Sequence, residues 1–170
     1  MRKQPGFSLI ELLIVVAIIL IIAAIAIPNL MRARMSANDS SAAASVRTIN
    51  TGEIAYFGAY PTIGFPLTLA MLGGASPCTP AAATGCLIDN FLATNGGGIG
   101  KSGYDFNAAG SASAASLVND QFYSTAVPIS SQYGTRSYCS IQDAVLRVQP
   151  SGNITLVGSY PACSALSAMQ

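Results

Sequence analysis

The sequence predicts an α+β fold in which a long N-terminal helix packs on a small antiparallel β-sheet. Three observations support this prediction. An apolar run fills residues 7–27, a helical stripe of mostly apolar residues continues to about residue 59, and short strand-like pieces separated by turn residues follow residue 102. With 170 residues, the chain is long enough for one ordinary domain plus an accessory segment.

The apolar run over residues 7–27 has the length of a membrane span. As a helix it would be about 31 Å long, close to the hydrocarbon core of about 30 Å. A cleaved secretory signal would be shorter and would end in small residues before a polar mature start, so this interpretation is disfavoured. A simple signal anchor remains an alternative interpretation of the run. Basic residues lie on both sides of the run, so charge alone does not orient it. They are Arg2, Lys3, Arg32 and Arg34.

A single carboxylate, Glu11, interrupts the apolar run. An ionised acid in a spanning helix costs about 2.5–3.5 kcal/mol at the bilayer centre and less near the ends, so such a residue is a functional candidate. The sequence offers Glu11 no partner within its own span. We therefore expect the partner to come from outside that span.

The run "GFSLIE" over residues 6–11, which follows the short basic leader "MRKQP", resembles the N-terminus of type IV pilins and type II secretion pseudopilins. The resemblance implies that a membrane prepilin peptidase cleaves after Gly6 and methylates the new N-terminal residue, Phe7. The amine of Phe7, cationic at neutral pH, would then pair with the Glu11 carboxylate of a neighbouring subunit during assembly. Pro28 also fits the family, and a proline inside a helix is expected to kink or loosen it.

Beyond Pro28 the helix is expected to continue to about residue 59, because no further proline occurs before Pro61. Residues that recur at spacings of three and four form a helical stripe, which is apolar apart from Glu53. The stripe consists of Met31, Met35, Ala42, Val46, Ile49, Glu53, Phe57 and Tyr60. The expected organisation is a leader (1–6), a long helix (7–59, of which 7–27 spans the membrane or forms a filament core), a connecting loop region (60–102), and a sheet with a disulfide-pinned C-terminal region (103–170).

The second half of the chain reads as loops and strands. Prolines and glycines punctuate the connecting region, which is expected to lie on the surface with a short helix at 88–93. Four strand-like pieces follow, at 103–107, 121–129, 136–149 and 153–157. The segment "PSGN" (150–153) predicts a hairpin turn between the last two, and "AAGSASAAS" (108–116) predicts a low-complexity loop.

Four cysteines follow the apolar run, an even number that is consistent with two disulfides in an oxidising compartment. We favour Cys78–Cys86, which would close a short loop, and Cys139–Cys163, which would pin the C-terminal tail as the family's C-terminal disulfide does. The other two connectivities stay open. Because the chain has no C-x-x-C pair and no histidine, a zinc site fits poorly, and neither a metal nor a cofactor is expected.

The motifs that would indicate an enzyme are incomplete. "GGGIGKS" (96–102) misses the phosphate-binding pattern because Asn95 stands where a glycine is required, and "GIGKSG" (98–103) lacks the flanking strand and helix of a dinucleotide site. Without histidine, a general base would have to be an acid, but no acid has a recognisable partner or nucleophile beside it, so we interpret the acids as solvated surface groups. They are Glu53, Asp89, Asp105, Asp120 and Asp143.

The resemblance therefore implies a structural subunit, not an enzyme. The expected protein is a type IV pilin precursor held in the bacterial inner membrane by a single pass, with its C-terminal region outside. Inner-membrane machinery would polymerise it with copies of itself into a helical extracellular filament for adhesion, motility or related surface functions. The alternatives are a type II secretion pseudopilin and, from a different class, a monomeric membrane-anchored extracytoplasmic binding domain. A net charge of +1 gives no field that would gather nucleic acid.

Overall fold

The computed structural model describes residues 7–149 and 158–169. The chain divides into two compact units, Met1–Arg34 and Met35–Gln170. We call the second unit the head. Helix α1, Leu9–Ala59, contributes residues to both units. The leader, the turn expected at 150–153 and the strand expected at 153–157 lie outside the described residues.

Helix α1 is 51 residues long and stays helical through Pro28. A proline removes one backbone donor without necessarily ending a helix, and the turns on either side keep their own hydrogen bonds. At the C-terminal end, the Tyr60 amide still donates to the Tyr56 carbonyl at 2.9 Å. Pro61 follows, and because it has no amide hydrogen it cannot extend the ladder.

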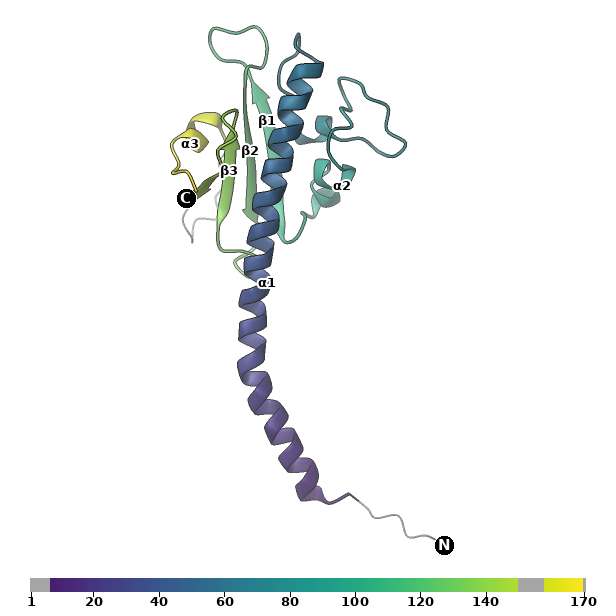
Figure 1. Cartoon of the computed structure of the whole chain (residues 1–170), viewed down its shortest axis with the longest axis vertical. Coiled ribbons are helices and arrows are strands. Elements are labelled where there is room, and N and C mark those ends of the chain that lie inside the picture. Colours follow the sequence, from purple (N-terminus) through teal and green to yellow (C-terminus); the bar gives the residue numbers. More distant parts are fainter. Residues whose placement is uncertain (1–6, 150–157, 170) are drawn as a thin grey trace. The chain divides into compact units, whose positions relative to one another are not determined.

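Among the described residues, the head contains a four-stranded antiparallel sheet in the order β1-β2-β3-β4. Its strands are β1 (Tyr104–Ser111), β2 (Gln121–Pro128), β3 (Ser137–Ile141) and β4 (Arg147–Gln149). Each pairs with its neighbour in the sequence. The α+β class expected from the sequence, a long N-terminal helix on a small antiparallel sheet, is confirmed (Figure 1).

Two strand expectations were wrong in their extent. Part of the low-complexity segment 108–116 belongs to β1, where Ser111 pairs with Gln121 and the Gly110 amide donates to the Pro66 carbonyl at 2.7 Å. The piece at 136–149 is two strands, because the chain reverses between β3 and β4. Small residues are poor strand formers by themselves, so long-range pairing decides their state.

Between α1 and the sheet, the connecting region is mostly irregular. It contains the short helices η1 (Leu69–Leu72), α2 (Asn90–Ala93) and η2 (Gly96–Gly98). Helix α2 falls within the segment expected at 88–93. The side chain of Asp89 accepts a hydrogen bond from the Leu92 amide at 2.8 Å and so caps the start of this helix.

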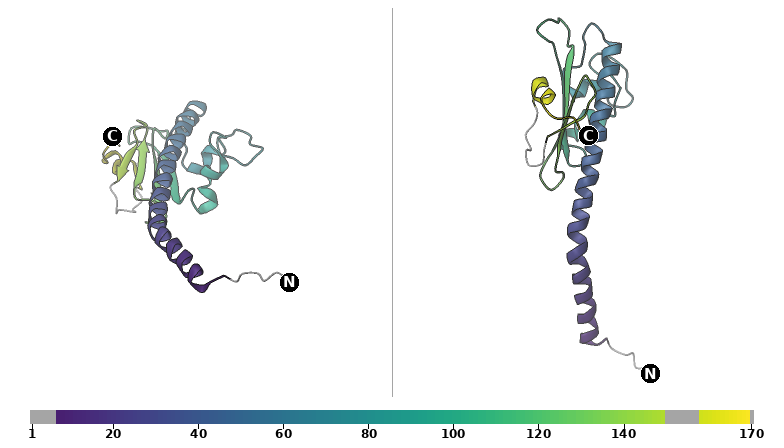
Figure 2. Two further views of the ribbon diagram at one scale, coloured as in Figure 1. Left: turned by 60° about the horizontal axis from the view of Figure 1, so that its bottom comes forward. Right: turned by 60° about the vertical axis from the view of Figure 1, so that its left-hand side comes forward.

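Within the head, α1 packs on one face of the sheet (Figures 1 and 2). The buried α1 residues Ala42, Val46, Ile49 and Tyr56 share a core with side chains from β1, β2 and β3. The strand partners are Tyr104, Phe106, Ala108, Ala126 and Tyr138. The expected stripe was wrong at two positions, since Met31 is 50% exposed in the first unit and Phe57 is 36% exposed, whereas Tyr56 is fully buried.

The other face of β3 carries a second, smaller core. Successive strand residues point to opposite faces, so Tyr138 joins the core under α1 while Cys139 and Ile141 join the smaller one. Helix α3, Tyr160–Ser164, supplies Cys163 to this second core. The right-hand view of Figure 2 shows α1 and α3 on opposite sides of the sheet.

Candidate assembly segment and its supporting head

The first described residues form the start of α1. Phe7 is 82% exposed, and Gly6 lies outside the described residues. The Glu11 carboxylate accepts a hydrogen bond from the Ser8 backbone amide at 2.9 Å, with the donor three residues earlier. This is the reciprocal half of a capping box, in which an acid in the first turn satisfies an orphan amide and complements the positive end of the helix dipole.

The expectation that Glu11 has no partner in its own span therefore needs correction. The partner is a neutral backbone amide, not a cation, and this one hydrogen bond leaves the carboxylate with further acceptor sites. The sequence contained the signal, since serine followed three residues later by glutamate before an apolar run is a helix-start pattern. Glu11 is both a helix cap and an exposed side chain in this unit.

The rest of the first unit exposes apolar side chains all around the helix. The most hydrophobic window of α1 has a mean hydropathy of 3.3, and none of it is buried inside the structure. Of the residues that the structure describes, one helix is long and apolar enough to cross a membrane, on length and composition. Apolar surface of this extent is typical of a segment that meets lipid or other apolar helices.

Asn50 fastens α1 to the sheet. Its side-chain amide donates to Ser140 Oγ on β3 at 2.7 Å, and its carbonyl oxygen accepts from Ser124 Oγ on β2 at 2.8 Å. Ser124 and Ser140 are direct partners in the β2–β3 register, so one side chain bridges both strands. All three residues are buried, and their mutual hydrogen bonds offset the loss of water.

Asp39 makes a second polar connection, at the start of the head. Its carboxylate accepts hydrogen bonds from the Tyr104 hydroxyl, and from the Thr135 amide at 3.2 Å and hydroxyl at 3.0 Å. The Tyr104 hydroxyl also donates to the Arg136 carbonyl at 2.9 Å. Burial, followed by the hydrogen bond to Asp39, raises the pKa of Tyr104 far above its ordinary value. This network ties α1 to β1 and to the loop before β3.

The glycine-rich segment 96–102 does not form a phosphate site. Ser102 leads into β1 instead of the helix that such a site requires. The Lys101 ammonium donates to Ser45 Oγ on α1 at 3.1 Å. The segment is thus the short helix η2 followed by a loop that contacts α1.

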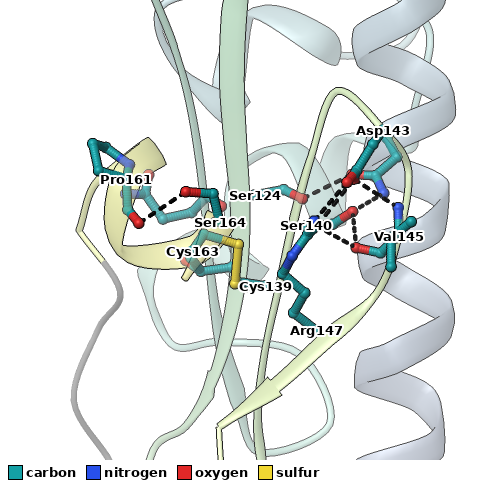
Figure 3. The surroundings of a disulfide bond; sticks show 12 residues. Ser124, Cys139, Ser140, Asp143, Val145, Arg147, Pro161, Cys163 and Ser164 are labelled. Atoms are coloured by element: carbon teal, nitrogen blue, oxygen red, sulfur yellow. Dashed lines mark hydrogen bonds and ion pairs between the residues drawn. A yellow bond between two sulfur atoms is a disulfide. The ribbon is translucent and has the colours of Figure 1, made fainter. Parts of the chain in front are cut away.

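The four cysteines form two disulfides, Cys78–Cys86 and Cys139–Cys163. Figure 3 shows the second, which joins β3 to α3. Tyr123, Tyr160 and Leu166 pack around it. The first closes the loop between η1 and α2, and the Tyr56 hydroxyl donates to the Ala82 carbonyl of that loop at 2.5 Å.

The turn between β3 and β4 is stabilised by an ion pair. Asp143 accepts from both terminal nitrogens of Arg147, at 3.0 and 2.5 Å, and from the Val145 amide at 3.0 Å (Figure 3). The hydrogen bond from Arg147 lowers the pKa of Asp143. The local chemistry of "DAVLR" explains why this segment turns instead of continuing as a strand.

The interpretation of the acids as solvated surface groups was wrong for Glu53. This residue is fully buried on α1. The others act locally, as Asp89 caps α2, Asp105 accepts from the Asn95 side chain, and Asp120 accepts from the Ser113 amide and hydroxyl at 2.6 Å each. No cluster of three or more His, Cys, Asp or Glu suited to a metal ion occurs among the described residues.

Sequence reasoning missed the roles of Asn50 and Glu53. Both lie at helical spacings from Val46, on the face of α1 that packs on the sheet. A polar residue at a core-facing position of a helical stripe is a detectable signal of a buried polar group. The sequence could not reveal that only one of the two has hydrogen-bond partners.

Comparison with known proteins agrees with the N-terminal motif. The family described as prokaryotic N-terminal methylation motif matches residues 1–27. The type IV wide pilus major component PilA4 of Thermus thermophilus is 65% identical over 40 residues, which is 24% of this chain and 30% of that protein. The type IV major pilin protein PilA of Myxococcus xanthus is 46% identical over 55 residues, 32% of this chain and 25% of that protein. No solved structure matches the chain significantly.

The fold and the segment together define a class, that of proteins with a long, N-terminally apolar helix and an α+β head. The matches to known proteins narrow this class of proteins further. The N-terminal segment matches the N-terminal methylation motif and is similar to the N-termini of two type IV pilins. The long, N-terminally apolar helix on a small antiparallel sheet is the α+β pilin fold. The matched region spans less than a third of the length of these relatives, which are named as a pilus major component and a major pilin.

Proposed function

We propose that this protein is a type IV pilin, processed at the Gly6–Phe7 bond and polymerised through residues 7 to about 59 into a helical extracellular filament. The observation that carries the proposal is the motif "GFSLIE" at the N-terminal start of an exposed apolar helix. A prepilin peptidase would cleave after Gly6 and methylate Phe7. The precursor would wait in the inner membrane with its head outside, where disulfides form.

Glu11 supports assembly in this proposal. Cleavage creates a cationic amine at Phe7, one helical turn from the carboxylate. In its own chain, Glu11 is held by the Ser8 amide, which leaves acceptor capacity for the Phe7 amine of a neighbouring subunit. At 4 Å and an effective dielectric constant of 20, such an attraction is about 4 kcal/mol before desolvation. This pairing would favour insertion of subunits in register.

The mass of the subunit tests the proposal. Filaments sheared from cells should contain a chain that begins at methylated Phe7, as measured by intact-mass spectrometry. A monomeric membrane-anchored binding domain would instead begin at Met1 and form no polymer. A pseudopilin would be processed but would form only short filaments at natural expression levels. Both relatives are named as major pilus components, which favours the pilin.

Replacing Glu11 with alanine should impair assembly without preventing membrane insertion, because the apolar run becomes more hydrophobic while the charge partner is lost. The measurement compares the amounts of pilin in membrane and sheared-filament fractions. We expect the filament fraction to fall at least tenfold. Glu11→Gln serves as the matched control for size and capping, and it should assemble as poorly as the alanine variant if charge is what matters.

Normal filament yield from both Glu11 variants would contradict the proposed charge pair. It would leave the processing proposal standing, because cleavage depends on the leader and Gly6.

A further inference from the structure

Glu53 is a buried acid to which no described residue donates a hydrogen bond. It has no exposed surface, and neither of its carboxylate oxygens has a partner among the described residues. Ile49 and Tyr56, one turn before and after it on α1, belong to the apolar core of the head. An ionised carboxylate in such a site would be heavily penalised, whereas the neutral acid is tolerated much better.

The neighbouring Asn50 shows that this fold can satisfy a buried polar group. Both ends of the Asn50 amide are paired, with Ser140 and Ser124. Glu53, three residues later, receives no such partner. Burial raises the pKa of Glu53 from 4.5 to about 8.

Among the described residues, no charged group contributes to the raised pKa of Glu53. On its own helix the nearby titratable groups are Tyr56 and Tyr60. Burial is the largest cause of the raised pKa of Tyr56, and electrostatic interactions with Tyr60 and Glu53 add to it. On the sheet, burial raises the pKa of Tyr104 and Tyr138, and the charged groups that act on them are Asp39 and Arg136. Lys101, from the loop before β1, donates to Ser45. Burial is the sole cause of the raised pKa of Glu53, so no cation offsets it.

Few other groups in the chain titrate near neutral pH. The sequence has no histidine, and all four cysteines are in disulfides. The reference pKa of aspartate is about 3.9 and that of tyrosine about 10, so among the ordinary groups only a terminal amine has a reference pKa near neutrality. Glu53 is the acid of the head whose pKa is raised into this range.

We propose that Glu53 is a proton switch of the head: the folded head holds this carboxyl in its protonated form, and loss of the proton loosens α1 from the sheet. The bistable contact is the packing of α1 residues 42–56 on β1, β2 and β3. A deprotonated Glu53 favours conformations in which water reaches the carboxylate. The proposal is independent of filament assembly.

The direction of the effect follows from proton linkage. Below about pH 4.5 the carboxyl is protonated in the folded and the unfolded chain, so it does not affect stability. Between about 4.5 and 8 only the unfolded chain releases the proton, so the ratio of folded to unfolded head falls up to about tenfold for each pH unit. Above about pH 8 both states are ionised and the loss is complete.

Urea unfolding of the full chain in detergent micelles tests the switch, with the near-ultraviolet circular dichroism of the buried tyrosines as the signal. From pH 5.5 to 7.5 the folded-to-unfolded ratio of the natural protein should fall by up to about a hundredfold. Glu53→Gln, which keeps the shape and removes the charge, should abolish most of that dependence. Asn50→Ala, the matched control for a buried polar residue, should lower stability by the same factor at every pH.

Equal pH dependence in the natural protein and in Glu53→Gln would overturn the proposal. A direct measurement of the Glu53 titration in the natural protein does not depend on how well any variant folds. The chain has two glutamates, Glu11 and Glu53, so glutamate labelled with carbon-13 at the carboxyl gives two resonances. One should titrate near pH 8, and Glu11→Gln should leave it in place. Titration of both resonances between pH 4 and 5 would refute a buried, protonated Glu53.

Discussion

Replacing Gly6 with leucine should leave the chain unprocessed and abolish surface filaments. In the resemblance on which the proposal rests, the peptidase cleaves after the glycine that ends the leader, so a large side chain at that position blocks maturation. Without cleavage, Phe7 has no free amine, and Glu11 keeps only the Ser8 amide as a partner. We expect filaments to fall below detection while the precursor accumulates in the membrane, measured by intact mass and electron microscopy.

The matched control for this variant is Gln4→Ala, which changes the leader but keeps "GFSLIE" intact. It should be processed and should assemble normally. Filaments of mature mass from Gly6→Leu would exclude Gly6–Phe7 as the processing site. Surface filaments made of unprocessed chains would show that assembly does not require cleavage. The free amine of Phe7 would then not be needed for assembly.

Removing the Cys139–Cys163 disulfide should produce the largest loss of head stability. It closes a sequence separation of 24 residues, and limiting the unfolded chain to that extent is worth about 3.5 kcal/mol by chain-entropy arguments. Both cysteines are fully buried in the core between β3 and α3, so the double variant Cys139→Ala, Cys163→Ala also loses packing there. The measurement is urea unfolding under non-reducing conditions at pH 5.5, where Glu53 is protonated.

The matched comparison is Cys78→Ala with Cys86→Ala. That pair closes a sequence separation of only 8 residues, worth about 2.5 kcal/mol by the same arguments. Its Cys78 end lies in an exposed part of the loop, so less packing is lost. A larger destabilisation from the shorter loop would contradict our view that the C-terminal disulfide is the main covalent support of the head.

Local sequence rules were sufficient for helix α1. Apolar residues at helical spacing and the lack of proline between Pro28 and Pro61 predicted it to within a residue at its C-terminal end. The N-terminal motif likewise needed no tertiary information, because "GFSLIE" is recognised as a linear pattern and the matched family covers the same residues.

The ends of the strands needed more than local rules. The alanines and glycine of β1 carry little strand preference, and they pair because β2 and the chain at Pro66 lie beside them. The sequence did not reveal the chain reversal after Ile141, because the apolar residues there resemble a continuing strand. In the structure, the Asp143–Arg147 ion pair stabilises a turn at this point.

The sequence by itself determined the apolar N-terminal segment, the helix that continues from it and the α+β class, since each depends on periodicity or on a contiguous motif. Only the tertiary structure decided which polar residues of that helix are satisfied. Asn50 meets two serines from strands some 70 to 90 positions away, whereas Glu53 meets none. Partners so distant in sequence leave no local pattern, and burial without a partner is what makes Glu53 sensitive to pH.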